Sequence, residues 1–117
     1  MSTMNCLSNL HVNIEKDKSG VSWGTEAERK AVQDDFGRVT AWAKENNRPI
    51  FLGEFGAYDR APMESRARYT EFVARAAEAS GWSWAYWQFD SDFILWDMKT
   101  GQWVEPILHA LIPPKQS

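Results

Sequence analysis

A single carboxylate stands in an otherwise apolar segment of this chain, and it is the residue best suited to chemistry. The segment Pro49–Gly56 reads PIFLGEFG, a short run of the kind that forms a strand buried on both faces of a parallel sheet. Burying the lone carboxylate of Glu54 would be costly, so a chain that keeps one there gives it a partner or a task. The alternative is that Glu54 ends the strand and points into water.

Tryptophan is the second feature with chemical meaning, because seven of the 117 residues are tryptophan. At this density, indole rings either fill the core or offer flat platforms to a ligand. Trp87 stands in a second strand-like segment, Trp82–Phe89, which reads WSWAYWQF. A carboxylate and an indole at one strand edge could together handle a sugar, because the apolar face of a pyranose stacks on indole and a carboxylate accepts hydroxyl hydrogen bonds or attacks the anomeric carbon.

Helices are expected before, between and after these two strands. Thr25 and Glu28 form a capping box that predicts a helix ending near Asn46. Apolar residues at helical spacing predict a second helix over residues 62–81 and a short third one over 106–111. The order helix, strand, helix, strand, helix, with a helix crossing between the strands, requires a parallel α/β unit of right-handed connection.

Strand periodicity divides each strand into two faces. The residues expected to share the open face are Ile50, Leu52 and Glu54 in the first strand and Ser83, Ala85 and Trp87 in the second. Glu54 and Trp87 would then lie near the carboxyl ends of neighbouring strands, where ligands bind in α/β folds. Trp82, Trp84 and Tyr86 would face the helices. Small residues inside and large ones outside favour a closed barrel.

The remaining tryptophans are expected to have mainly structural roles. Trp42 is assigned to packing, as are Trp82 and Trp84. Trp96 and Trp103 flank a predicted hairpin with its turn at residues 99–101. A cross-strand pair is the simpler account of these two, although either could extend a sugar-binding cleft.

Polar residues near the two strand ends are candidate contacts for substrate hydroxyls. They are Tyr58, Gln88 and Asp90, with solvated loop polarity as the alternative. Asp90 and Asp92 have too few ligands around them for a calcium loop. His11 and His109 have no Cys or His at zinc-ligand spacing.

Composition bounds the remaining function classes. A net charge of −3 with no basic cluster gives no case for binding nucleic acid or an anionic membrane, and the 44% apolar and 25% charged residues are typical of one soluble globular domain. Residues 1–18 contain no apolar core of signal-peptide length, and nothing approaches transmembrane length. Cys6 is alone, which excludes an intrachain disulfide. No cofactor is implied.

The two strand motifs, Arg48–Tyr58 and Ser83–Phe89, resemble the last third of a glycoside hydrolase family 5 endoglucanase, a cellulase. The resemblance runs from about Val21 to Pro113. It implies a (β/α)8 barrel with Glu54 at the end of the seventh strand as catalytic nucleophile and Trp87 on the eighth strand stacking against the sugar. It also implies hydrolysis of β-1,4-glucosidic bonds in cellulose or related β-glucans by a retaining mechanism. Members of the family are usually secreted.

The departures from the family pattern are equally informative. The family carries its acid/base Glu on the fourth strand in an Asn-Glu-Pro motif, and this chain has no Asn-Glu-Pro. Strands one to six of the barrel have no counterpart here. We therefore expect a partial (β/α)8 segment over residues 21–113, preceded by an unmatched leader over residues 1–20 that could be partly disordered, and followed by a tail over residues 114–117.

Two parallel strands alone would expose their edges and leave Ile50, Leu52 and Trp87 in water. Such a fragment is expected to be marginal by itself, so we expect copies to self-associate into a homo-oligomer that completes the sheet. The competing hypothesis is a non-catalytic carbohydrate-binding or purely self-assembling fragment.

Overall fold

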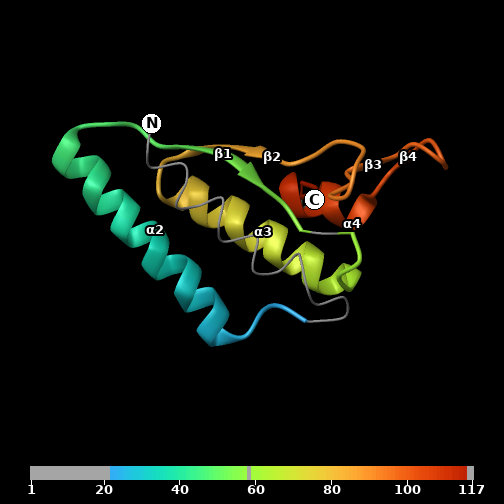
Figure 1. The fold of residues 1–117 in the computed structure, drawn as a ribbon, viewed down its shortest axis with the longest axis horizontal. Helices are drawn as coiled ribbons and strands as arrows, with labels where there is room; N and C mark the ends of the chain where they lie inside the picture. Colours follow the sequence, from blue (N-terminus) through green and yellow to red (C-terminus); the bar gives the residue numbers. More distant parts are fainter. Residues whose placement is uncertain (1–21, 58, 116–117) are drawn as a thin grey trace.

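The computed structural model describes residues 22–57 and 59–115. Figure 1 shows a small two-stranded sheet with helices along it and a hairpin beyond the second strand. The elements in chain order are α2 (Glu26–Asn46), β1 (Phe51–Phe55), α3 (Met63–Ala79), β2 (Ser83–Tyr86), β3 (Trp96–Asp97), β4 (Gln102–Trp103) and α4 (Glu105–Leu111). The predicted order of helices and strands is confirmed.

Helix α2 begins at the predicted capping box. Thr25 Oγ1 accepts a hydrogen bond from the Glu28 N–H, and Glu28 Oε2 accepts bonds from the N–H groups of Gly24 and Thr25 at 2.7 and 2.9 Å. These backbone donors, that of Gly24 first, lower the pKa of Glu28. The helix ends at Asn46 and is followed by the C-cap residue Asn47, which has a left-handed φ of 50° and whose N–H donates to the carbonyls of Ala43 and Lys44.

Helix α3 is the crossover between the strands. Pro62 is the N-cap residue of α3, although the sequence predicts it one position later, in the first turn of the helix. Tyr69, Val73 and Ala77 recur at helical spacing and are buried. The helix therefore turns one apolar stripe toward the sheet and α2, as the periodicity predicts.

Strands β1 and β2 are parallel, as predicted, but the predicted faces of β1 are wrong. Phe51 pairs with Ser83 and Leu52 with Trp84, so Leu52 shares the helix-facing side rather than the open side. The register then shifts between Leu52 and Phe55, and Phe55 is buried while Glu54 is exposed. A plain two-residue alternation does not foresee such an irregularity, which returns Glu54 to the open face.

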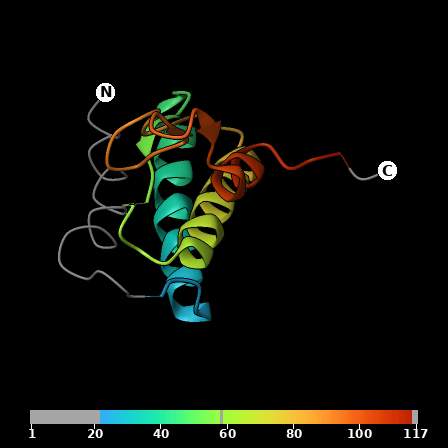
Figure 2. The ribbon, with the colours of Figure 1, turned by 90° about the vertical axis from the view of Figure 1, so that its right-hand side faces the viewer.

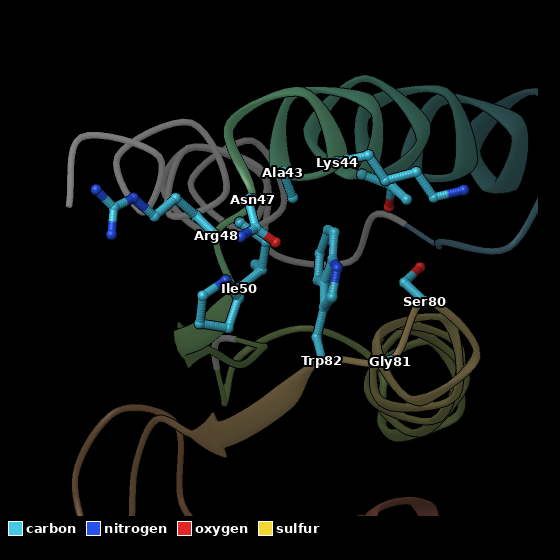
Figure 3. Close-up of a pocket in the computed structure, with 10 residues that line it drawn as sticks. Ala43, Lys44, Asn47, Arg48, Ile50, Ser80, Gly81 and Trp82 are labelled. Atoms are coloured by element: carbon cyan, nitrogen blue, oxygen red, sulfur yellow. The ribbon is translucent and has the colours of Figure 1, made fainter.

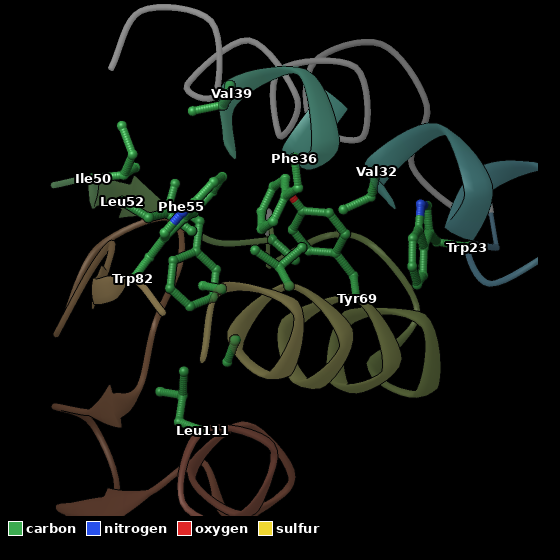
Figure 4. Packing of buried hydrophobic residues seen from close by; sticks show 14 of the residues in the cluster. Trp23, Val32, Phe36, Val39, Ile50, Leu52, Phe55, Tyr69, Trp82 and Leu111 are labelled. Carbon is green, nitrogen blue, oxygen red and sulfur yellow. The ribbon is translucent and has the colours of Figure 1, made fainter. Parts of the chain in front are cut away.

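The hydrophobic core fills the space between the sheet and the helices (Figure 4). Helix α2 contributes Phe36, whose ring lies 4.5 Å from that of Trp82. Leu52 and Ile50 are buried in this cluster, so the expectation that they stand in water is wrong. The predicted helix-facing position of Trp82, Trp84 and Tyr86 is confirmed, because the first is buried and the others pack against the core.

The opposite face of the sheet carries no helix within the described part of the chain, and the view in Figure 2 shows the helices gathered on one side. The side chain of Phe51 on this face is 46% exposed. Exposed aromatic surface on a sheet face marks a place where another molecule or chain segment packs.

Two other tryptophans have clear positions. Trp23 is buried against Tyr69, and its backbone N–H donates to Ser65 Oγ while its carbonyl accepts from Arg68 Nε. This contact ties the segment before α2 to α3. Trp42 lies on α2 and is 36% exposed, so its assignment to packing is wrong: the apolar stripe of α2 passes through Val39 instead.

The predicted hairpin is confirmed. Strands β3 and β4 are antiparallel, and Trp96 pairs directly with Trp103 at a ring distance of 5.0 Å, the cross-strand pair expected from the sequence. The turn is closed by Asp97 Oδ1, which accepts bonds from the N–H groups of Lys99 and Thr100.

Among the described residues, none of the helices combines the length and the apolar character that crossing a membrane requires.

Candidate active site

Glu54 and Trp87 lie at the carboxyl ends of neighbouring strands. Glu54 is the penultimate residue of β1, and Trp87 follows the last residue of β2. Both side chains are exposed, Trp87 at 44%, and the register shift in β1 keeps Glu54 out of the core. An indole and a carboxylate are thus open to a ligand at the edge where parallel strands bind ligands.

The backbone of Trp87 is held against the end of β1. Its N–H donates to the Phe55 carbonyl at 2.7 Å, which continues the parallel pairing beyond β2. Gly56 lies so close to the Trp87 carbonyl oxygen that a Cβ at this position would overlap it, and that Cβ would also touch the Phe93 ring at 3.4 Å. Glycine is therefore required at position 56 by close packing of two backbones.

Two backbone hydrogen bonds order the segments that follow β1 and β2: the first joins the two segments, and the second lies within the segment after β2. The Asp59 N–H donates to the Asp92 carbonyl at 2.7 Å, and the Gln88 N–H donates to the Phe93 carbonyl at 3.2 Å. The peptide bond between Trp87 and Gln88 is cis. These contacts fix the edge around Trp87 through the backbone.

The other predicted site residues have different surroundings. Asp90 is exposed, and Gln88 is half-buried. Trp96 is half-buried, because its ring stacks on Phe89 and meets Trp103 edge-on. Tyr58 lies outside the described residues. Among the described residues, no group of three or more His, Cys, Asp or Glu side chains is placed to hold a metal ion.

A buried polar cluster beneath this edge was not foreseen from the sequence. Arg66 of α3 is 4% exposed, and its Nε and Nη2 atoms have no hydrogen-bond partner in the described part of the chain. The buried Tyr86 hydroxyl likewise makes no hydrogen bond of good geometry, although the Ala57 N–H lies near it. Burial lowers the pKa of Arg66, while Tyr86 and Asp59 oppose this. Helical spacing was the sequence signal that could have revealed the burial of Arg66, because Arg66 lies three residues before Tyr69 and seven before Val73 on the buried stripe of α3.

Burial also raises the pKa of Tyr86 to about 12, against the opposing charge of Arg66. A folded-state pKa above the unfolded value means that the unfolded chain loses this proton first as the pH rises. The stabilisation that comes from the neutral Tyr86 phenol should therefore be fully present below pH 10. It should be lost between about pH 10 and 12, which lowers the free energy of unfolding by on the order of 2 kcal/mol. Urea unfolding over this range should show the fall in the parent chain and a smaller one in Tyr86→Phe. Equal slopes in both would contradict this pKa.

A cavity of about 460 Å³ lies at the opposite end of the strands (Figure 3). It is bounded by the end of α2, the segment before β1 and Trp82, which precedes β2. These are the amino ends of the strands, whereas Glu54 and Trp87 stand at the carboxyl ends. The cavity is therefore separate from the candidate active site.

Comparison with known proteins identifies the family. Residues 8–93 match the family described as cellulase (glycosyl hydrolase family 5). The chain belongs to glycosyl hydrolase family 5. Endoglucanase H of Acetivibrio thermocellus is 29% identical in an alignment of 99 residues that covers 80% of this chain and 11% of the relative. Endoglucanase B of Clostridium cellulovorans is 29% identical over 66 residues, and this alignment covers 56% of this chain and 15% of the relative.

Solved structures of the family share the backbone of this segment. Thermotoga maritima Cel5A in complex with cellobiose matches with a TM-score of 0.78 and 42% identity, over 80% of this chain and 30% of that protein. The cellulose synthase subunit Z of Clostridioides difficile matches with a TM-score of 0.77 and 40% identity, over 80% and 32%. The chain is thus a partial segment of a family 5 (β/α)8 barrel, spanning about a third of these structures. The predicted family and fold class are confirmed.

Proposed function

We propose that this chain provides the nucleophile edge of a retaining endo-β-1,4-glucanase, with Glu54 as nucleophile and Trp87 as the sugar platform. The observation that carries the proposal is the exposure of both side chains at the carboxyl ends of adjacent parallel strands in a family 5 segment. Thermotoga maritima Cel5A, a structural relative, has been crystallised with cellobiose and with mannotriose. A β-glucan chain is the substrate proposed here. Tyr58, Gln88, Asp90 and Trp96 are proposed as further substrate contacts.

The chemistry assigned to Glu54 is displacement at the anomeric carbon. One carboxylate oxygen forms a bond to that carbon while the bond to the leaving oxygen breaks, and the leaving oxygen takes a proton from an acid. Water then attacks the anomeric carbon, the bond to the Glu54 carboxylate breaks, and the proton of the water passes to the conjugate base of that acid. Leaving groups that are stable as anions, such as dinitrophenolate, need no acid. An edge with a nucleophile alone should therefore cleave aryl cellobiosides far better than cellulose.

The acid is proposed to come from assembly of copies of this chain. Phe51 and Trp87 expose aromatic surface on the sheet face that has no described helix, and the outer edges of β1 and β2 are not paired within the described residues. Pairing such edges between copies would extend the sheet. It could also bring several Glu54 carboxyl groups close together, so that one stays protonated and serves as the acid.

Sedimentation and a two-substrate assay on the same sample test this proposal. We expect an oligomer at micromolar concentration, cleavage of dinitrophenyl cellobioside, and slower release of reducing sugar from carboxymethylcellulose. A folded monomer that persists at all concentrations would contradict self-association. Failure to cleave the aryl cellobioside would contradict the role of Glu54.

A second candidate function is non-catalytic carbohydrate binding. The exposed indole of Trp87 favours it, because stacking on a sugar needs no second carboxylate. Calorimetric titration with cellooligosaccharides separates the two functions: binding without cleavage of either substrate identifies a binding module.

A further inference from the structure

Three aromatic side chains form a second exposed surface beyond Trp87. Phe89, Trp96 and Trp103, here called the hairpin aromatic patch, lie on the segment after β2 and on the β3–β4 hairpin. The rings of Phe89 and Trp96 are parallel within 3° at 6.2 Å, and Trp103 meets both edge-on. Trp96 is the inner member, whereas Phe89 is 53% and Trp103 46% exposed.

The patch is held rigidly by the backbone. The N–H groups of Leu95 and Trp96 both donate to the Phe89 carbonyl, at 3.0 and 2.8 Å. The Val104 N–H donates to the Leu95 carbonyl at 2.8 Å, and the turn of the hairpin is closed by Asp97. Rings fixed in this way lose little entropy when a flat apolar surface stacks on them.

The patch is continuous with the proposed substrate edge. Phe89 follows Trp87 by two residues, so their Cα atoms are at most roughly 7 Å apart. Figure 1 shows the hairpin extending from the end of β2 on the side away from α2. The exposed carboxylates of Asp90 and Asp92 and the amide of Gln102 stand in the same segment. Flat rings beside neutral and anionic acceptors suit a ligand with apolar faces and many hydroxyl groups, and disfavour an anionic one.

We infer that Trp103 forms an accessory platform for a β-linked glucan chain, with Phe89 and Trp96 bracing its ring edge-on, and that it binds the part of the chain that extends beyond the sugar at Trp87. This inference rests on the proposed function. It changes the assignment of Trp96, which supports the other two rings from within the patch. The platform should add affinity for long oligosaccharides and none for cellobiose.

Calorimetric titration of the Glu54→Gln chain with cellobiose and with cellohexaose tests the inference, since this background leaves the sugars intact. Adding Trp103→Ala should weaken cellohexaose binding about fivefold and leave cellobiose binding unchanged. Trp103→Phe, which keeps an aromatic ring, should retain most of the affinity. Trp42→Ala is the matched control, because it removes an exposed indole from α2, and it should change neither value.

The outcomes distinguish this inference from the proposed function. Equal binding of both sugars by the parent, or an equal effect of Trp103→Ala and Trp42→Ala, would overturn the accessory platform and leave the proposed function intact. Binding of neither sugar would overturn both. A change in sedimentation on Trp103→Ala, with sugar affinities unchanged, would show a contact between copies and so also overturn the platform.

Discussion

Replacing Gly56 with alanine is expected to destabilise the fold by about 3 kcal/mol and to weaken cellobiose binding. The added Cβ would overlap the Trp87 carbonyl oxygen, and neither backbone can move freely, because the Trp87 N–H is bonded to Phe55. Relief therefore requires the Trp87 segment to separate from β1. Urea unfolding measures the loss of stability, and calorimetric titration measures the loss of cellobiose affinity.

Gly37→Ala is the matched control for this substitution. Gly37 lies in the interior of α2, and a Cβ there meets no atom within 4 Å. Alanine should stabilise the helix by about 0.5–1 kcal/mol. If Gly56→Ala cost no more stability than Gly37→Ala, then Gly56 would not lie against the Trp87 carbonyl. Close packing of these two backbones would then not be what positions Trp87 at the end of β1.

Replacing Glu54 with glutamine should reduce cleavage of dinitrophenyl cellobioside about a thousandfold or more. The amide keeps the size of the side chain but cannot attack the anomeric carbon. Because the dinitrophenolate leaves without an acid, this substrate reports on the nucleophile alone. Initial rates of dinitrophenolate release provide the measurement.

Glu71→Gln provides the comparison, because Glu71 is an exposed carboxylate on α3 outside the candidate active site. It should leave the rate of dinitrophenolate release unchanged. Cellobiose affinity should survive in Glu54→Gln, since Trp87 is intact. Equal rates for the two variants would show that Glu54 is not the nucleophile.

The sequence was sufficient for the elements whose signals are local. The capping box of Thr25, the apolar stripe of α3 and the turn before Gly101 each depend on residues within a few positions of one another, and each is confirmed. The position of Glu54 at a carboxyl strand end could also be predicted, because it needs only the strand and its polarity.

The remaining features depend on contacts between distant segments. The register shift that buries Phe55 arises from pairing with β2, and no periodicity within β1 reveals it. The requirement for glycine at position 56 comes from the carbonyl of Trp87, thirty-one residues later. The buried cluster of Arg66 and Tyr86 likewise joins α3 to β2, and charge alone predicts Arg66 to be exposed.

Trapping the glycosyl intermediate tests the central claim most directly. The chain would be incubated with a fluorinated cellobioside that carries a dinitrophenolate leaving group. Fluorine next to the anomeric carbon slows hydrolysis of the intermediate by destabilising its oxocarbenium-like transition state. We expect the intact mass to increase by one fluorocellobiosyl group, on the peptide that contains Glu54. An unchanged mass, or a label on another residue, would contradict the assignment of Glu54 as nucleophile.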